Sequence, residues 1–157
     1  MLYFAYGSNL DWNQMRERCP SAKFVCMAKL ADHALAFTRR SETRRCGVAD
    51  AVPKRGAHVW GVVYQIEEID MDRLDASEGY RPSRPRNTNS YVREEQTVHE
   101  NGDQTAPLLA AVYFANKQND PPLPSAEYKR LIVEGAKSWH LPEDYVSALE
   151  SIQVSRD

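Results

Sequence analysis

The sequence has no long hydrophobic run and no excess of positive charge. No stretch of its 157 residues approaches the roughly 18 apolar residues of a membrane-spanning helix. Its 20 lysines and arginines are outnumbered by 22 aspartates and glutamates, whereas a nucleic-acid-binding protein usually has a basic surface. The first residues also lack the basic start and apolar region of a secretory signal. We therefore expect a cytoplasmic protein that binds neither membranes nor nucleic acids.

Cysteine is scarce as well. Cys19, Cys26 and Cys46 are odd in number and fit no metal-binding spacing. A free cysteine usually packs as a small hydrophobic side chain, so we expect three buried or half-buried thiols. The sequence therefore predicts no metal site.

Apolar and β-branched runs, separated by turn residues, indicate an all-strand core with a few helices around it. The length and the 42% hydrophobic content fit one domain, residues 1–157. Residues 58–66 (HVWGVVYQI) are apolar or aromatic on both faces, which predicts a central strand covered on both sides. Asn101-Gly102-Asp103 is typical of a hairpin turn. The expected strands are residues 2–6, 23–30, 34–38, 47–52, 58–66, 91–99 and 108–115.

Capping residues predict the helices. Asp11 followed by Gln14 fits the start of a short helix, and Ser125 fits the start of a longer one. Asp70 is the expected N-cap of a further helix, with Ile69 and Leu74 spaced for a hydrophobic staple. A last helix is expected from residue 142. Helices at separate places among many strands predict an α+β domain with a mainly antiparallel or mixed sheet.

The first strand breaks at Tyr6-Gly7-Ser8-Asn9, immediately before a helix. Gly7 allows the backbone to turn and a ligand to approach without a Cβ atom in the way. The backbone N–H groups of Ser8 and Asn9 precede a helix start, where anions are favoured. The segment therefore suits binding of a carboxylate or of a developing oxyanion. An ordinary strand–turn–helix connection explains the same residues.

Glu78 is a candidate acid/base residue. It lies at the expected C-terminal end of a helix, where the partial negative charge disfavours an ionised carboxylate. The nearby Tyr80 adds desolvation, so we expect a pKa above the ordinary value of about 4.3. A glutamate with a raised pKa suits general base catalysis near neutral pH. A solvated glutamate at a helix end is the alternative interpretation.

Two basic segments allow further hypotheses. Residues 81–86 (RPSRPR) follow Glu78 and are either a solvated, proline-stiffened loop or a lid whose arginines meet a carboxylate of the substrate. Residues 39–45 (RRSETRR) lie between two expected strands. We interpret this second segment as a solvated turn rather than a nucleic-acid-binding patch, because the net charge is not positive and no aromatic platform is interleaved with it.

Four separated motifs resemble the γ-glutamylcyclotransferases. Residues 2–10 (LYFAYGSNL) are similar to the signature strand and loop of that family, and residues 59–63 (VWGVV) to its central strand. Leu74-Asp75, followed by Glu78-Gly79, resembles the segment that carries the catalytic glutamate. Residues 121–145 resemble its C-terminal helical region. The resemblance covers residues 1–150 and has the motifs in the family's order.

The resemblance implies a small mixed β-barrel with flanking helices and a single cavity. It also implies a cofactor-free reaction that converts a γ-glutamyl compound into 5-oxoproline and a free amine or amino acid. Glu78 takes the place of the catalytic glutamate. The expected substrate-binding residues are those of the loop and two pocket tyrosines, namely Tyr3, Phe4, Ala5, Tyr6, Gly7, Ser8, Asn9, Tyr91 and Tyr128.

Three functions remain open from the sequence. The first is a γ-glutamylcyclotransferase acting on γ-glutamyl amino acids or dipeptides. The second is a γ-glutamylamine cyclotransferase acting on isopeptides or on a γ-glutamyl-protected biosynthetic amine. The third is a non-enzymatic small-molecule binding module, because a fold alone does not fix a function. The sequence leaves the leaving amine and the choice between monomer and homodimer open.

Overall fold

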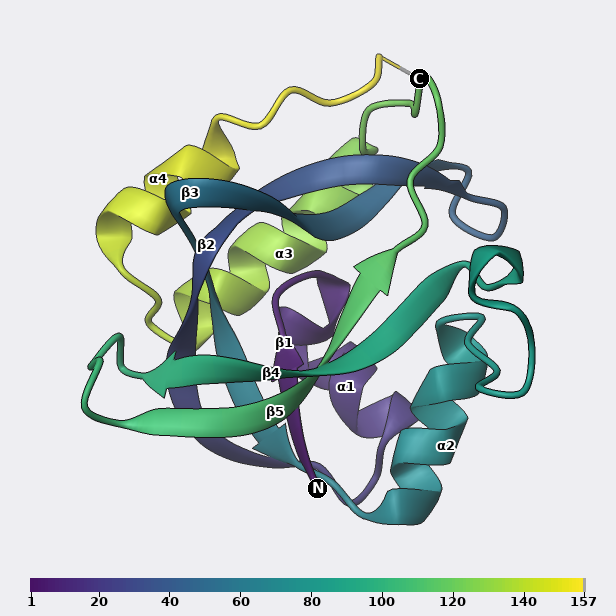
Figure 1. Ribbon diagram of the computed structural model, residues 1–157. Coiled ribbons are helices and arrows are strands. Elements are labelled where there is room, and N and C mark those ends of the chain that lie inside the picture. The colour runs from purple at the N-terminus through teal and green to yellow at the C-terminus, as the bar shows by residue number, and fades with distance from the viewer. Residues whose placement is uncertain (157) are drawn as a thin grey trace.

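A closed five-stranded barrel forms the centre of the protein, with helices packed against its outside (Figure 1). The computed structural model describes residues 1–156. Within that part of the chain no helix is long and apolar enough to cross a membrane. The strands are β1 Leu2–Ala5, β2 Lys23–Ser41, β3 Cys46–Gln65, β4 Tyr91–Glu100 and β5 Pro107–Ala115. The helices are α1 Trp12–Arg18, α2 Glu68–Ser77, α3 Ala126–Ser138 and α4 Glu143–Glu150, with short 3₁₀ turns η1 Ser8–Leu10 and η2 Arg86–Thr88.

The barrel has the strand order β1-β3-β2-β4-β5 and closes between β5 and β1. That closing pair is parallel, with Tyr3 opposite Ala111, and the other neighbours are antiparallel. The mixed barrel with flanking helices is therefore confirmed. β3 lies between β1 and β2, and its Val59, Val62 and Val63 are fully buried, so the prediction of a covered central strand is also confirmed.

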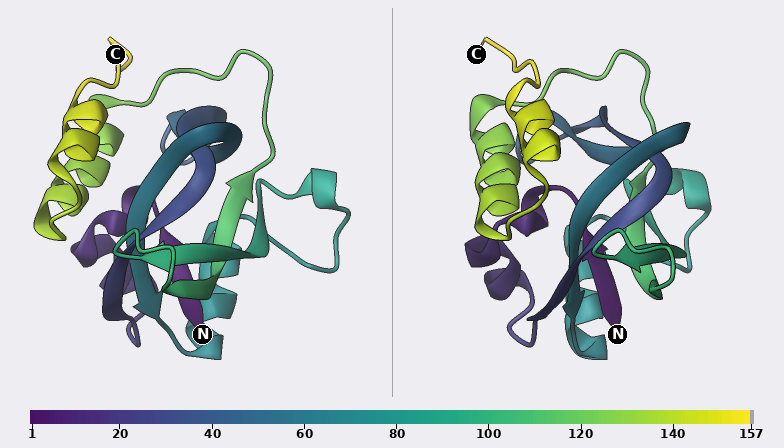
Figure 2. Two further views of the ribbon diagram at one scale, coloured as in Figure 1. Left: turned by 60° about the vertical axis from the view of Figure 1, so that its left-hand side comes forward. Right: turned by 90° about the vertical axis from the view of Figure 1, so that its left-hand side faces the viewer.

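β2 and β3 are much longer than the sequence predicted. The four separate strands expected between residues 23 and 66 join into two continuous ones, paired from Lys23–Gln65 to Ser41–Cys46. Register shifts interrupt the pairing, and Asp32 has a positive φ of 58° beside one of them. Such bulges bend a strand and disturb its alternation, which explains why the sequence pattern looked broken. The hairpin runs past the end of the barrel (Figure 2).

Helix α3 is pinned to the turn that follows β1. Gly135 approaches η1 so closely that a Cβ atom there would lie 2.5 Å from the carbonyl carbon of Leu10. The indole Nε1 of Trp139 donates a 2.9 Å hydrogen bond to the Leu10 carbonyl. Ser125 caps α3 as predicted, because its side chain accepts a hydrogen bond from the backbone N–H of Tyr128. These contacts fix the loop between β1 and α1 against a rigid helix.

The prediction of Asp70 as an N-cap is wrong. Helix α2 begins at Glu68, so Asp70 lies within its first turn. The buried carboxylate of Asp70 accepts hydrogen bonds from the backbone and the hydroxyl of Ser21, which tie α2 to the segment after α1. Ile69 is 60% exposed, so it forms no staple with Leu74. The partner of Asp70 is distant in the sequence, and local spacing could not reveal it.

Candidate active site

A cavity of about 580 Å³ opens at the end of the barrel from which the β2–β3 hairpin projects. Most of its lining comes from the loop after β1, the C-terminal end of α2, the β2–β3 hairpin and the start of β4. Arg18 of α1, Tyr113 of β5 and Tyr128 of α3 complete it. The structure therefore brings the separated motifs into one site.

Eight of the ten predicted site residues line this cavity. Glu78, Tyr91 and Tyr128 do so from three different elements. The others come from β1 and its loop, namely Tyr3, Tyr6, Gly7, Ser8 and Asn9.

Phe4 and Ala5 do not line the cavity, which corrects the expectation that they contact the substrate. Both are fully buried inside the barrel. Their backbone and the Phe4 ring press against Gly61, where a Cβ atom would lie 2.2 Å from the Ala5 carbonyl oxygen. These two residues therefore hold β1 against β3 and so help to position the loop that follows β1.

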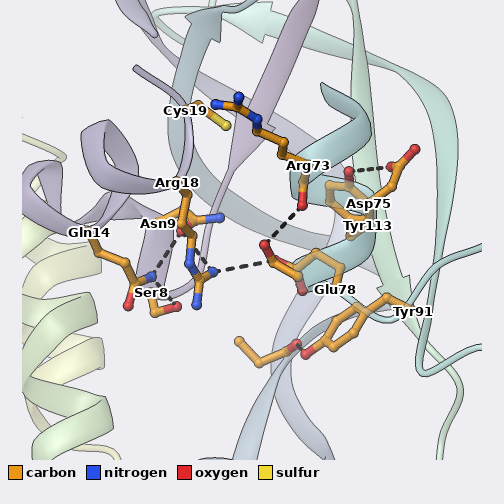
Figure 3. Close-up of polar contacts among 12 residues, drawn as sticks. Ser8, Asn9, Gln14, Arg18, Cys19, Arg73, Asp75, Glu78, Tyr91 and Tyr113 are labelled. Atoms are coloured by element: carbon orange, nitrogen blue, oxygen red, sulfur yellow. Dashed lines mark hydrogen bonds and ion pairs between the residues drawn. The ribbon is translucent and has the colours of Figure 1, made fainter. Parts of the chain in front are cut away.

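The side chain of Asn9 organises the loop after β1. Its Nδ2 donates to the Tyr3 hydroxyl at 3.0 Å, and its Oδ1 accepts from Gln14 Nε2 at 2.9 Å and from Arg18 at 3.2 Å. Gln14 Nε2 also donates to the Ser8 hydroxyl at 2.8 Å. Asp11 caps α1 as predicted, but Gln14 serves the loop rather than completing a capping box. The loop is thus held rigidly by α1 (Figure 3).

Glu78 lies just beyond α2 with its carboxylate facing the cavity. Its side chain is 17% exposed, and Oε1 lies 3.8 Å from an Arg18 guanidinium nitrogen. Burial raises the pKa of Glu78 above its ordinary value, while the positive charges of Arg18 and Arg44 oppose this rise. The predicted direction is confirmed. The cause differs in part, because burial in the cavity dominates and Tyr80 is not among the lining residues.

Tyrosines form much of the wall around Glu78. The Tyr91 hydroxyl donates to the Ala49 carbonyl at 2.5 Å, and the Ala49 N–H donates to the Tyr128 hydroxyl at 3.0 Å. The Tyr6 hydroxyl donates to the Tyr113 carbonyl at 2.5 Å. Burial raises the pKa of Tyr128 to about 12. These rings therefore stay neutral and give Glu78 a rigid, weakly solvated surrounding.

A partly buried ion pair holds the part of α2 that precedes Glu78. The Asp75 carboxylate accepts two hydrogen bonds from Arg93, at 2.9 and 3.1 Å, and a third from the Tyr113 hydroxyl at 2.6 Å. This network fastens the C-terminal end of α2 to strands β4 and β5. Figure 3 shows the contact between Asp75 and Tyr113. In the sequence, Asp75 is marked only as part of the motif Leu74-Asp75, which precedes Glu78. Its partners lie 18 and 38 residues away, so no local pattern marked the network.

The sequence also did not predict that arginines of the β2–β3 hairpin would line the cavity. The sequence predicted a solvated turn at residues 39–45, yet Arg39, Arg40 and Arg44 line the cavity. Arg44 donates to Gln14 Oε1 at 2.6 Å, and its guanidinium carbon lies 5.0 Å from the centre of the Tyr128 ring. The interpretation as a wholly solvated turn is therefore wrong. The long hairpin carries these side chains to the site, which short separate strands would not do.

The basic loop at residues 81–86 contributes no arginine to the cavity lining. Arg84 donates to the Asn89 side chain at 2.9 and 3.2 Å, and Arg86 pairs with Glu94. Arg81 is exposed. The hypothesis of an arginine lid is therefore not supported at this segment. Within residues 1–156, no group of three or more His, Cys, Asp or Glu side chains is placed to hold a metal ion.

Comparisons with known proteins agree with this geometry. The model of the AIG2-like family matches residues 58–149. γ-Glutamylcyclotransferases from Homo sapiens and Bos taurus are 33% and 36% identical to the chain, over 97% of it and 78% of each relative. A solved structure titled γ-glutamyl cyclotransferase superposes with a TM-score of 0.88 at 32% identity, covering 100% of this chain and 90% of the other.

A more distant structure, a glutathione-specific γ-glutamyl cyclotransferase from yeast, has a TM-score of 0.65 at 14% identity. It covers 95% of this chain and 93% of its own, and shows a shared fold alone. The barrel and its cavity thus define a protein of the AIG2-like class. More narrowly, the chain belongs to the γ-glutamylcyclotransferase family.

Proposed function

We propose that the protein converts γ-glutamyl amino acids or dipeptides into 5-oxoproline and a free amino acid, with Glu78 as the acid/base residue. The observation that carries this proposal is the half-buried carboxylate of Glu78, which faces a polar cavity beside the loop Gly7-Ser8-Asn9. The relatives named γ-glutamylcyclotransferase support it. A binding module without activity would not need a carboxylate held there.

The reaction is an intramolecular substitution. The α-amine of the glutamyl part attacks its own γ-carbonyl carbon, a new C–N bond closes the five-membered ring, and the old amide C–N bond breaks. Because the nucleophile is tethered, the cavity only has to fold the substrate into a reactive shape. Well-oriented intramolecular reactions reach effective molarities of about 10⁵ M or more. The rigid tyrosine wall suits that task.

Glu78 accepts and donates the protons that the reaction transfers. The α-amine is an ammonium group at neutral pH and becomes a nucleophile only after it loses a proton. The Glu78 carboxylate accepts that proton and then donates one to the departing nitrogen, so proton uptake and release balance. A raised pKa brings the carboxylate closer to the working pH, which favours both steps. Such catalysis contributes about 10²–10⁴-fold in rate.

The loop after β1 is suited to the glutamyl part. Ser8 and the backbone of Gly7 lie at the cavity surface, within the turn that Asn9 holds in place. Backbone N–H groups in such a turn serve either the α-carboxylate or the oxygen that gains charge as the ring closes. The neutral tyrosine hydroxyls add a wall that excludes water. No cofactor enters these steps.

The identity of the leaving group is tested with a substrate panel. Purified protein is incubated with γ-glutamyl dipeptides, γ-glutamyl-ε-lysine and glutathione, and 5-oxoproline is measured by mass spectrometry. We expect release from the γ-glutamyl dipeptides. Release from γ-glutamyl-ε-lysine alone would assign the protein to the γ-glutamylamine cyclotransferases. Absence of 5-oxoproline from every compound would contradict the enzymatic function.

A cytoplasmic location remains a prediction from the sequence.

A further inference from the structure

Arg39 and Arg44 face the cavity without a carboxylate partner. Four arginines line the cavity, and two of them are each close to a glutamate, at 3.8 and 2.9 Å. Among residues 1–156, neither Arg39 nor Arg44 has a carboxylate at ion-pair distance. A guanidinium group stays charged at any physiological pH and favours planar, bidentate contact with a carboxylate. The cavity therefore has two guanidinium groups that form no ion pair with a carboxylate of the described residues.

Arg44 lies at the end of the cavity that holds the loop after β1. Its guanidinium donates to Gln14 Oε1 at 2.6 Å and lies 3.4 Å from the Ser8 hydroxyl. It also packs over the Tyr128 ring, with 5.0 Å between the guanidinium carbon and the ring centre. All of these partners are neutral, so the charge of Arg44 remains available to an anion bound beside Ser8.

Arg39 lies at a different edge of the same cavity. Its guanidinium donates one hydrogen bond, of 3.1 Å, to the backbone carbonyl of Asn116, just beyond β5. The backbone N–H of Asn116 in turn donates to the carbonyl of Ser90, a lining residue next to Tyr91. One contact leaves most of the five N–H donors of Arg39 free. Arg39 is thus anchored beside Asn116 and Ser90 rather than at the Ser8 loop.

We propose that the β2–β3 hairpin forms a carboxylate clamp, in which Arg44 binds the α-carboxylate of the glutamyl part and Arg39 binds the carboxylate of the leaving amino acid. The proposal rests on the proposed function and names its specificity determinant. Two free guanidinium groups match the two carboxylates of a γ-glutamyl amino acid. A γ-glutamyl compound of a simple alkylamine has only one carboxylate and leaves Arg39 unmatched. The hairpin therefore selects amino acids over simple amines as leaving groups.

Kinetics with two matched substrates test the role of each arginine. γ-Glutamyl-alanine and γ-glutamyl-ethylamine differ only in the carboxylate of the leaving group. Arg39→Gln lowers kcat/KM for γ-glutamyl-alanine about 10- to 100-fold and changes that for γ-glutamyl-ethylamine by less than about twofold. Arg44→Gln lowers kcat/KM for both substrates. Arg45→Gln is the control, because Arg45 is an exposed arginine of the same hairpin outside the lining.

Binding of unreactive analogues separates the clamp from the activity. N-Glutaryl-alanine keeps both carboxylates of γ-glutamyl-alanine but lacks the attacking amine, and N-glutaryl-ethylamine lacks the second carboxylate as well. Calorimetry with the wild-type protein is expected to show tighter binding of N-glutaryl-alanine. Arg39→Gln abolishes that difference, while Arg45→Gln keeps it. This result stands even if no substrate is turned over.

Two results would overturn the clamp. One is an equal loss for both substrates, or for both analogues, in Arg39→Gln. The other is a preference for the alanine compounds that survives in Arg39→Gln. Circular dichroism spectra of all variants establish whether a loss arises from unfolding, and Arg39→Lys provides a second, charge-conserving variant with an intermediate expected loss. Absence of 5-oxoproline together with arginine-dependent binding would reject the activity and retain the clamp.

Discussion

Opposing influences act on the carboxylate of Glu78. Burial raises its pKa, and the positive charges of Arg18 and Arg44 limit that rise. Without the arginines, the pKa of this carboxyl group would be higher still, and it would stay protonated, and unable to accept a proton, up to a higher pH. Without burial, it would be a weaker base and would take up the proton of the amine less readily. Arg18, 3.8 Å from Glu78, therefore lowers the pKa of the residue that we propose as the acid/base group.

Arg18→Gln is expected to shift the pH dependence of activity. The guanidinium of Arg18 lowers the pKa of Glu78, so its removal raises that pKa further. The base form of Glu78 then appears only at a higher pH. The acid limb of the kcat/KM profile, measured with γ-glutamyl-alanine, moves toward higher pH.

Arg16→Gln is the matched control for this shift. Arg16 is exposed on the same helix and forms no contact with Glu78. Its acid limb should coincide with that of the wild-type protein. An acid limb of Arg18→Gln that stays in place, or moves to lower pH, would show that Arg18 does not set the pKa of Glu78.

The sequence identified some of the site residues and missed others for a physical reason. Glu78 and the Gly7-Ser8-Asn9 loop lie in motifs whose chemistry is local, at a helix end and at a strand end. Arg18 and Arg44 reach the cavity only through the packing of distant elements. A charged residue in a helix or a turn is usually solvated, so composition alone gives no signal for such an approach.

At the scale of elements, the site depends on how η1 is fixed. Gly135 lets α3 contact the Leu10 backbone, and the Trp139 indole donates to the same carbonyl. The loop Gly7-Ser8-Asn9 is continuous with η1. A rigid helix thus supports the residues that we propose bind the glutamyl part.

Gly135→Ala is expected to destabilise the protein although alanine is the better helix former. The added Cβ atom would lie 2.5–2.6 Å from three atoms of Leu10, two of them backbone atoms that cannot move aside cheaply. Overpacking of this kind costs about 1–3 kcal/mol, more than the gain of up to about 1 kcal/mol in helix propensity. Urea unfolding measures the difference in the free energy of unfolding.

Glu134→Ala tests whether that loss is due to the close contact. Glu134 is the exposed neighbour on the same helix, so its replacement should change the free energy of unfolding by less than about 0.5 kcal/mol. If Gly135→Ala were as stable as the wild-type protein, the close approach of α3 and η1 would not be a structural requirement.

Element boundaries were predicted best where the signal is local. The cap at Ser125 and the central strand in residues 58–66 rest on neighbouring residues, and both are confirmed. The predicted N-cap at Asp70 was wrong because the Asp70 carboxylate accepts hydrogen bonds from Ser21, which is far away in the sequence. The break expected between residues 30 and 34 proved to be a bulge at Asp32 within one long strand.

At the scale of the whole molecule, one core fills the barrel and covers every thiol. Cys19, Cys26 and Cys46 are buried and free, as the sequence predicted. Burial raises the pKa of Cys19 to about 11, so its reactive thiolate form is rare at neutral pH. The closure of the barrel was implied by the family resemblance. Local patterns did not reveal the parallel contact of β1 with β5, which has a single registered pair.

The native protein is expected to react slowly with Ellman's reagent. At pH 7.5 the three thiols should be labelled over hours without denaturant and within minutes in 6 M guanidinium chloride, since labelling requires opening of the core. Absorbance at 412 nm follows the reaction. Rapid labelling of even one thiol in the folded protein would contradict the burial of all three.

The acid/base role of Glu78 is tested most directly by Glu78→Gln, with Glu68→Gln as an exposed control on α2. The amide keeps the shape of the side chain but cannot accept the proton of the α-amine. We expect kcat/KM for 5-oxoproline release from γ-glutamyl-alanine to fall by about 10²–10⁴-fold, with binding of N-glutaryl-alanine retained and Glu68→Gln fully active. A Glu78→Gln variant as active as the wild-type protein would show that Glu78 is not the acid/base residue.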